Sequence, residues 1–353
     1  MKTGLTIFFL LITALTALAQ SGRVKPAESP TPSPVTRPTV VYIPTQPNAR
    51  YPTPNPTATP ATGSEEEVLK VESTLVPIPV SVVDASGRSI TNLRLADFEL
   101  KIDGRPAEIS DIARSETPIR LAMLFDNSSS VLIAREFEKD AAVKFFRRVI
   151  RPEKDLAALF SVSTITRLEQ RFTKDVFLLT QAIQAFPPPE GATALLDGII
   201  DAADYLRDAD GRRVVVIVSD GDDTVSDSTL EQTLRSLQFA NCQVYVVKTT
   251  DFENYKRTGV RGGNANIRQL AAERRMIELT SQTGGAVYSP IDERELEEAF
   301  RQISADLAQQ YILSYYPEKD DERRGEFRQI SLAVKSKTNA TVRTRKGYYV
   351  PKK

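Results

Sequence analysis

Three short segments of the sequence place carboxylates and hydroxyls beside apolar or helical patterns. They are Asp126-Asn127-Ser128-Ser129-Ser130 after LAMLF, Gly191-Ala192-Thr193 before a helical stripe, and Ser219-Asp220-Gly221-Asp222-Asp223 after VVVIV. Each segment alone is well explained as a helix cap, because Ser, Thr and Asp oxygens accept hydrogen bonds from the free N–H groups of a first turn. Together, however, the segments supply hard oxygen donors, which are the ligands that Mg²⁺ and similar cations prefer.

One cation site could draw on all three segments. Asp126, Ser128 and Ser130 stand at positions i, i+2 and i+4, so a turn can direct their oxygens to one point. Thr193 and Asp220 can join them from neighbouring strand ends. Two carboxylates offset the charge of a divalent ion, and neutral hydroxyls leave coordination positions open. This donor set favours Mg²⁺ or Mn²⁺ over Ca²⁺, which takes more carboxylates.

Composition narrows the possible chemistry. The 353 residues include no His and a single Cys, which excludes Ser-His-Asp hydrolases, His-ligated metals, cysteine-rich metal clusters and an intrachain disulfide framework. Basic and acidic residues number 46 each, so the chain lacks the basic excess typical of a nucleic-acid binder. A hydrophobic fraction of 41% is ordinary for a globular protein with a buried core.

Alternating patterns predict the elements that would position the three segments. Strands are expected at Leu121–Phe125, Leu156–Phe160, Val214–Val218 and Val244–Val247, and helices near residues 137–149, 195–206, 229–239, 267–280 and 293–307. The VVVIV strand has no polar face, which is typical of a strand covered by helices on both sides. The alternation predicts an α/β fold with a doubly wound, mostly parallel sheet flanked by helices. Ligands of such sheets bind outside the carboxyl ends of the strands.

The flanks of this central region show strand periodicity instead. Apolar residues alternate in both the 67–116 and the 309–353 segments, and Asp103-Gly104 is a hairpin-turn signal. Neither flank is large enough to fold alone, so we expect the two to pair into one small β module beside the 118–308 domain. Pro77 and Pro79 predict that their strand lies at an edge.

The first 62 residues are expected to lie outside the folded domains. Lys2, an apolar run from about Leu5 to Leu18, and Ala17 and Ala19 match a Sec signal peptide covering residues 1–19. The run is shorter than the about 20 residues that a membrane span needs, so we expect cleavage, no transmembrane span in the mature protein, and export to the periplasm or beyond. Residues 20–62 hold 11 of the 22 prolines, which predicts a disordered Pro-rich linker.

Two further segments carry weaker predictions. Asp222 and Asp223 are expected at the exposed entrance of the helix that follows them. Residues 251–264 are polar and long for a connection, so we expect a loop on the metal-bearing edge, where it either contributes specificity or is a plain surface loop.

The ordered set of site residues resembles the von Willebrand factor type A (VWA) domain with a metal-ion-dependent adhesion site (MIDAS). That family's motif is D-x-S-x-S after the first strand, a Thr in a second loop and an Asp in a third. The matching residues here are Asp126, Ser128, Ser130, Thr193 and Asp220. The stretches TALLDGI, VIVSDGDD and TGGAVYSP are also similar, and the resemblance covers residues 118–308. The flanks resemble those of exported bacterial VWFA-related proteins.

The resemblance implies an exported, non-enzymatic adhesion or protein-interaction module. Its metal, Mg²⁺ or Mn²⁺, would keep one coordination position for an acidic side chain of a protein partner. Two alternatives remain: a cell-envelope scaffold with a structural metal, and a metal-dependent hydrolase using Asp126 and Asp220. The hydrolase lacks a candidate general base beyond the ligands themselves.

Overall fold

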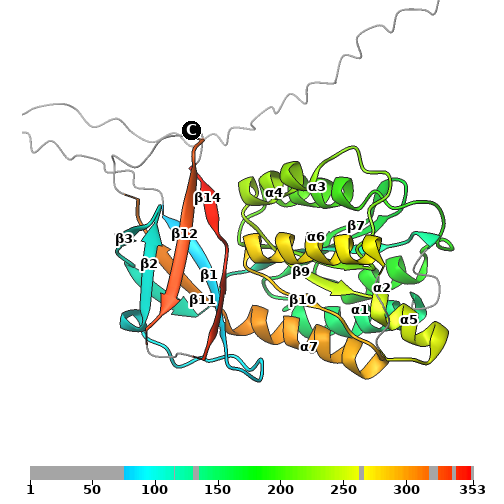
Figure 1. Ribbon diagram of the computed structural model, residues 1–353, viewed down its shortest axis with the longest axis horizontal. Coiled ribbons are helices and arrows are strands. Elements are labelled where there is room, and N and C mark those ends of the chain that lie inside the picture. The colour runs from blue at the N-terminus through cyan, green and yellow to red at the C-terminus, as the bar shows by residue number, and fades with distance from the viewer. Residues whose placement is uncertain are drawn as a thin grey trace, which may run out of the picture. The chain divides into compact units, whose positions relative to one another are not determined.

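The computed structural model describes residues 75–114, 116–129, 135–261, 266–317, 325–335 and 339–350. The predicted signal peptide, the Pro-rich linker and Ser130 lie outside these residues. The central sheet contains β5 (Ile119–Asp126), β6 (Leu156–Val162), β7 (Thr166–Thr173), β8 (Arg212–Ser219), β9 (Cys242–Lys248) and β10 (Val287–Tyr288). Its strand order is β10-β9-β8-β5-β6-β7, and only β7 pairs antiparallel with its neighbour (Figure 1). The predicted doubly wound, mostly parallel sheet is confirmed.

Helices cover both faces of this sheet. They are α1 (Arg135–Val149), α2 (Val176–Gln184), α3 (Leu195–Leu206), α4 (Leu230–Phe239), α5 (Thr250–Thr258), α6 (Ile267–Thr283) and α7 (Glu293–Gln309). Apolar side chains of α1, α2, α5 and α7 share one buried cluster, and those of α3, α4 and α6 share another. None of the described helices has the length and apolar character needed to cross a bilayer.

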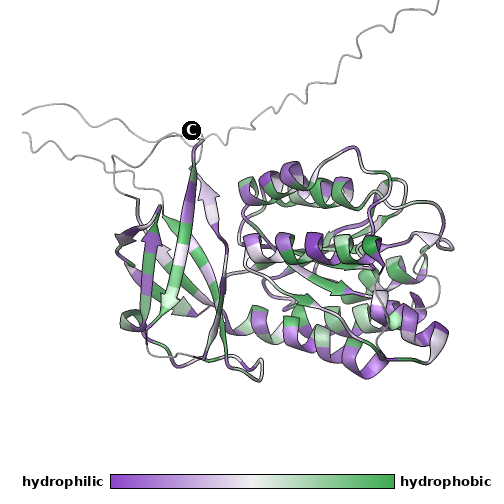
Figure 2. Ribbon diagram, in the orientation of Figure 1, coloured by the Kyte–Doolittle hydropathy of each residue, from purple (hydrophilic) through white to green (hydrophobic). Residues whose placement is uncertain are grey.

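Strand β8 shows why the sequence folds into three layers. Val214, Val216 and Val218 pack into one cluster, whereas Val215 and Ile217 pack into the other, and all five are fully buried. A strand whose alternate residues are all apolar can be stabilised only where both faces are covered. The inner strands of the central sheet are accordingly strongly hydrophobic, whereas the edge strand β7 is largely polar and the helices alternate between hydrophobic and hydrophilic residues (Figure 2).

The order of the strands creates a switch point between β5 and β8. After β5 the chain builds β6 and β7 on one side, and it then crosses to build β8, β9 and β10 on the other. Helix α1 follows β5 onto one face and α4 follows β8 onto the opposite face. The loops leaving these two adjacent strands therefore diverge, and a crevice at such a point is where open α/β sheets bind ligands.

The two flanks form a β module of two sheets, ordered β13-β1-β11-β4 and β14-β12-β2-β3. Its strands are β1 (Val76–Val83), β2 (Phe98–Ile102), β3 (Arg105–Ala107), β4 (Asp111–Arg114), β11 (Tyr311–Tyr315), β12 (Phe327–Val334), β13 (Thr341–Thr344) and β14 (Gly347–Tyr349). Strand β1 pairs with β13 and β2 pairs with β12, so each sheet joins residues from both ends of the folded region. Ile78, Leu100 and Leu313 lie in their shared core.

The prediction that β1 lies at a sheet edge is wrong. Strand β1 has β11 on one side and β13 on the other, but the two neighbours pair with different halves of it. Pro77 and Pro79 lie opposite Ser314 and Ile312 of β11, whereas β13 begins to pair only at Val80. The prolines thus occupy the half of β1 with one strand neighbour, where a missing N–H costs no ladder hydrogen bond.

The expected hairpin at Asp103-Gly104 is present. Asp103 and Gly104 have φ values of 49° and 78°, and they connect the antiparallel pair β2 and β3. The expected loop over residues 251–264, by contrast, is wrong in its first half, because Thr250–Thr258 forms helix α5. Phe252 anchors that helix in the core, and this single apolar residue left too weak a period for the sequence to predict a helix.

Candidate metal centre

Asp126 is the last residue of β5 and is only 1% exposed. Its Oδ1 accepts a hydrogen bond from the backbone N–H of Ser128 at 2.9 Å. Its Oδ2 accepts one from the Ser219 hydroxyl at 2.5 Å. Burial and, to a smaller extent, the negative charge of Asp220 together raise the pKa of Asp126 to about 6. The carboxylate is therefore held in one orientation and lies in an excess of negative charge.

Asp220 follows β8, the strand next to β5. Its Oδ1 accepts the backbone N–H of Asp222 at 2.9 Å, and its carbonyl oxygen accepts the Thr250 hydroxyl at 2.9 Å. Ser219 links Asp126 to the backbone of the loop after β8, because its Oγ donates to Asp126 and accepts the N–H of Gly221 at 2.9 Å. The switch point of the sheet thus brings together the first and third predicted segments.

Thr193 belongs to the middle segment and is bonded to the third. Its N–H donates to the Thr224 hydroxyl at 3.0 Å, and its carbonyl oxygen accepts the N–H groups of Thr224 and Val225 at 2.8 and 3.2 Å. The Thr193 residue is 3% exposed, and no described residue forms a hydrogen bond with its hydroxyl. As far as the described residues go, that hydroxyl is therefore available as a metal ligand.

The middle segment is bonded to the first segment as well. The N–H of Glu190 donates to the carbonyl oxygen of Asn127 at 3.0 Å, and the N–H of Ser129 donates to that of Gly191 at 3.3 Å. All three predicted segments therefore converge at one edge of the sheet. Of the five predicted ligands, Asp126, Ser128, Thr193 and Asp220 lie in these connected loops, while Ser130 lies outside the described residues.

Asp223 has a role that the sequence did not reveal. The expectation that it lies at the entrance of the next helix is wrong, because α4 begins seven residues later and is capped by Thr229. Instead, the Oδ1 of Asp223 accepts the N–H groups of Leu195 and Leu196 at 2.8 and 3.1 Å, capping α3. The N-cap residue of α3, Ala194, has no side-chain oxygen. The loop after β8 therefore supplies the cap through Asp223, which is 28 residues from Leu195 in the sequence. No local sequence signal identifies such a cap.

Asp222, the other carboxylate of this pair, lies at the surface. Its Oδ2 accepts a hydrogen bond from the Arg268 guanidinium at 2.6 Å, with the Arg268 side chain 70% exposed. The Asp222 side chain itself is 31% exposed, and the expectation that it lies at the entrance of the next helix is wrong for Asp222 too, because α4 begins only at Leu230.

Glu138 is a further acidic residue of this region, and sequence analysis did not single it out. It lies on α1, is 1% exposed, and neither of its carboxyl oxygens has a hydrogen-bond partner of normal geometry in the described part of the chain. Burial raises the pKa of Glu138 well above its usual range, and the charges of Glu253, Asp126 and Asp220 add to that effect. A Glu within an amphipathic helix is normally read as a surface residue, which explains why the sequence did not single it out.

The donor set suits a hard divalent cation. No group of three or more Asp, Glu, His or Cys side chains is arranged as a metal cluster in the described ranges. A cation at the switch point would therefore have two carboxylates, with hydroxyls and water completing its coordination, as Mg²⁺ tolerates. The mutual repulsion of Asp126 and Asp220 is the electrostatic condition that such an ion relieves.

Comparison with known proteins gives structural likenesses only. No family model and no curated protein matches the chain. Among solved structures, the chain is similar to the PilB minor pilin from Streptococcus sanguinis (TM-score 0.43, 13% identity), with 57% of this chain and 63% of PilB covered. The chain thus spans less than two thirds of that protein.

Two shorter proteins are similar over nearly their whole length. They are the vWF domain of the type V pili tip protein Mfa5 from Porphyromonas gingivalis (TM-score 0.41, 13% identity, 53% of this chain and 94% of that one) and BatB from Bacteroides thetaiotaomicron (TM-score 0.40, 12% identity, 53% and 98%). At such low TM-scores, none of these likenesses assigns a function to the chain.

Proposed function

We propose that this protein is an exported, non-enzymatic interaction module of the VWA type, which binds an acidic side chain of a partner protein through a divalent cation. The observation that carries the proposal is the position of Asp126. Its buried carboxylate lies beside the charge of Asp220 at the switch point of the sheet. Two carboxylates kept together in this way need a compensating positive charge, and the surrounding donors are hydroxyls.

The proposed ligands are Asp126, Ser128, Ser130, Thr193 and Asp220. When bound, Mg²⁺ or Mn²⁺ would supply a positive centre with coordination positions open to water or to a partner's carboxylate. The chain's own residues prepare that position: the Ser128 N–H and the Ser219 hydroxyl orient the carboxylate of Asp126. The Thr193 loop is bonded to both neighbouring loops, so it needs little ordering on binding.

A hydrolytic role has less support. Catalysis at this site would need a general base within reach of the substrate. Glu138 is an additional carboxylate of the region, but at 1% exposure it lies beneath the surface; Asp223 is bound to the N–H groups of α3 and Asp222 to Arg268. Turnover of ester, peptide or phosphate substrates by the metal-loaded protein, lost in Asp126→Ala, would overturn the non-enzymatic proposal.

Calorimetric titration tests the metal site. We expect saturable binding of Mg²⁺ and Mn²⁺, tighter than that of Ca²⁺, and a stability gain of about 2.7 kcal/mol at a free-ion concentration of about 100 Kd. Asp126→Ala should abolish both effects, whereas Asp140→Ala, an exposed Asp on α1, should leave them unchanged. If neither Mg²⁺ nor Mn²⁺ bound saturably to the wild-type protein, the metal-site proposal would be wrong.

A pull-down from cell-envelope extracts tests the interaction. We expect capture of a partner by the wild-type protein with Mg²⁺ present, and loss of capture with chelator or with Asp126→Ala. Neutralising the partner's acidic residue, Asp→Asn or Glu→Gln, should also abolish binding. Metal binding without any metal-dependent capture would favour the structural-scaffold alternative instead.

Export is proposed on the pattern of residues 1–19 alone. We expect the exported protein to begin near Gln20, and amino-terminal sequencing of protein recovered from the periplasm or medium tests this. A mature protein that still begins at Met1 would contradict cleavage.

A further inference from the structure

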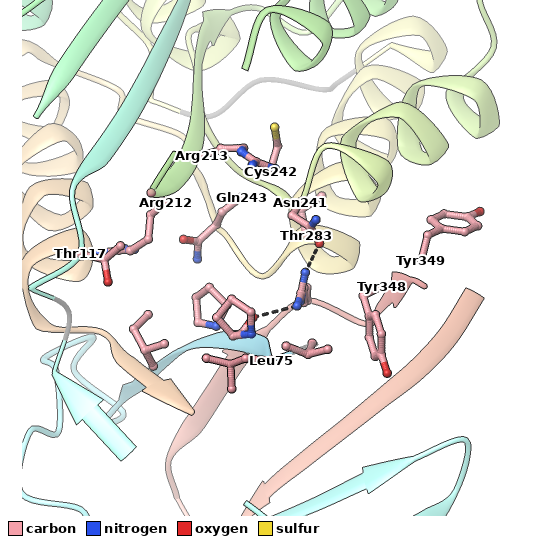
Figure 3. Close-up of a pocket in the computed structure, with 16 residues that line it drawn as sticks. Leu75, Thr117, Arg212, Arg213, Asn241, Cys242, Gln243, Thr283, Tyr348 and Tyr349 are labelled. Atoms are coloured by element: carbon pink, nitrogen blue, oxygen red, sulfur yellow. Dashed lines mark hydrogen bonds between the residues drawn. The ribbon is translucent and has the colours of Figure 1, made fainter. Parts of the chain in front are cut away.

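A cavity of about 310 Å³ lies at the amino ends of β8 and β9, away from the candidate metal centre at the carboxyl ends of the strands. Its walls come from three parts of the chain: the first residues of β8 and β9, the prolines of β1 with Ile312 of β11, and the 345–349 segment (Figure 3). The volume is at the lower end of the range for small-molecule sites.

The cavity carries concentrated positive charge. Arg212, Arg213 and Arg345 all line it, and no Asp or Glu is among its described lining residues. Within the described part of the chain, neither Arg213 nor Arg345 forms an ion pair. Burial lowers the pKa of Arg345 to about 10, which leaves its guanidinium protonated at neutral pH. Two cations that have no counter-charge among the described residues therefore line one pocket.

Neutral groups hold these two guanidinium groups in place. Arg213 donates from Nε and Nη1 to the carbonyl oxygens of Ala209 and Ala240, each at 2.8 Å. Arg345 donates to the Oδ1 of Asn241 and to the carbonyl oxygen of Pro77, the latter at 2.7 Å, and dashed lines in Figure 3 mark both bonds. The Nε of Arg345 is buried and has no hydrogen-bond partner among the residues that the structure describes. The guanidinium groups are thus positioned by the fold but not neutralised by it.

Apolar and aromatic side chains form much of the remaining wall, beside the polar residues Thr117, Gln243 and Thr283. Pro77, Pro79 and Ile312 form one side, and Tyr348 lies beneath the Arg345 guanidinium, 5.7 Å from it to the ring centroid. Tyr349 is fixed by stacking on Phe239, with ring centroids 3.9 Å apart. An apolar wall combined with a few placed polar groups is the usual build of a small-molecule site.

We propose that this cavity binds a small organic anion, whose carboxylate or phosphate group pairs with Arg213 and Arg345 and whose flat apolar body packs against the prolines and Tyr348. An anion would supply the counter-charge that the described lining of the cavity lacks, and guanidinium groups bind carboxylate and phosphate oxygens through charge-assisted hydrogen bonds. The site is independent of the candidate metal centre, because no residue is shared between the two.

Titration calorimetry with phenyl phosphate and benzoate tests the proposal, with benzyl alcohol as the neutral analogue. The full chain is used in the presence of chelator, so the result does not depend on the metal site. We expect saturable binding of at least one anion with a Kd of roughly 1 mM or tighter, as for fragment-sized ligands, and no saturable binding of benzyl alcohol.

Substitutions locate the binding. Arg213→Met should weaken anion binding about tenfold or more, because a charge-assisted contact is lost. Arg147→Met, at an exposed position of α1, is the matched control and should bind as wild type does. Arg345→Met should weaken anion binding as Arg213→Met does, provided that circular dichroism and thermal melting show that Arg345→Met is folded. If Arg345→Met does not fold, the result with Arg213→Met alone decides the test. Failure of both anions to bind, equal binding of benzyl alcohol, or unchanged binding by Arg213→Met would each overturn the proposal.

Discussion

Asp126 and Glu138 are both almost completely buried, yet their surroundings differ. Both oxygens of Asp126 accept hydrogen bonds, whereas those of Glu138 lack partners of normal geometry among the described residues. A buried carboxyl without donors is costly in its charged form, and a second carboxyl nearby raises that cost. We therefore expect that, in the metal-free protein, the buried carboxyl groups of Asp126 and Glu138 lower the stability of the folded state when they are charged.

The first prediction concerns the pH dependence of stability in chelator. The pKa of Asp126 is raised from its ordinary 3.8 to about 6 in the folded state. The folded protein therefore binds this proton more tightly than the unfolded chain, so the stabilisation is fully present below pH 3.8 and is lost as pH rises to about 6. We expect a loss of about 3 kcal/mol across that interval. Urea unfolding at a series of pH values measures this loss of stability. Asp126→Asn should remove this part of the dependence of stability on pH. An unchanged pH dependence in Asp126→Asn would contradict the raised pKa of Asp126.

The second prediction is that Glu138→Met stabilises the metal-free protein at neutral pH by about 1–3 kcal/mol. The substitution replaces a buried carboxyl that has no hydrogen-bond partner of normal geometry among the described residues with an apolar side chain of similar volume. Glu136→Met on the exposed face of the same helix serves as the control and should change stability by less than about 0.5 kcal/mol. Denaturant midpoints compare the two, and a destabilised Glu138→Met would show that the carboxyl has an unrecognised stabilising partner.

At the scale of elements, the metal-site loops are stabilised by one another more than by their own helices. Helix α3 has no side-chain cap of its own and receives one from Asp223 in the third loop. In return, Asp197 in the first turn of α3 accepts the N–H groups of Asp227 and Ser228 at 2.9 and 3.0 Å. These reciprocal bonds hold the Thr193 and Asp220 loops side by side, which makes their separation a property of the packed domain.

The third prediction tests this reciprocal capping. Asp223→Ala should destabilise the protein by about 1–2 kcal/mol, because the first N–H groups of α3 lose their acceptor. It should also weaken Mg²⁺ binding, since Thr193 directly precedes that helix. Asp222→Ala removes only a surface pair with Arg268 and should cost about 1 kcal/mol or less. Thermal melts and calorimetry measure both variants; equal losses in the two would mean that the α3 cap has no special importance.

At the scale of the whole molecule, a buried glutamine joins the β module to the central sheet. Gln310 lies between α7 and β11 and is 1% exposed. Its Nε2 lies within hydrogen-bond distance of Ser81 Oγ (2.9 Å), Gln243 Oε1 (3.1 Å) and the Tyr245 hydroxyl (3.1 Å). Its Oε1 accepts a hydrogen bond from Arg212. Because buried polar networks fix relative orientation, we expect the β module and the central sheet to unfold as one cooperative unit.

The fourth prediction concerns that shared module. Ending the chain after Pro317 removes β12, β13 and β14, the partners of β2 and β1. The buried side chains Ile330 and Tyr348 are lost as well, so we expect destabilisation of about 3 kcal/mol or more. Hydrogen exchange should accelerate throughout residues 75–110. Unchanged exchange there would mean that the amino-terminal strands are stable without their carboxyl-terminal partners.

The sequence by itself determined which segments become strands and helices and which of them carry oxygen donors. Apolar runs and 3.6-residue stripes are local signals, so the β8 strand and helix α3 could be predicted, and Asp126, Thr193 and Asp220 could be placed at strand or helix ends. Local periodicity reports burial but not the identity of the neighbour. It therefore could not predict that β8 would lie beside β5, which brings Asp126 next to Asp220.

Only the tertiary structure decided the remaining features. The prolines of β1 led to the wrong prediction of an edge strand, because a sequence cannot show that two neighbouring strands pair with different halves of one strand. Asp223 reads as a cap for the helix that follows it, and Glu138 as a surface residue, because their actual surroundings come from elements distant in the chain. The cavity of arginines likewise forms from residues more than 100 positions apart. In each case long-range packing, which no local pattern encodes, sets the charge and the contacts of the residue.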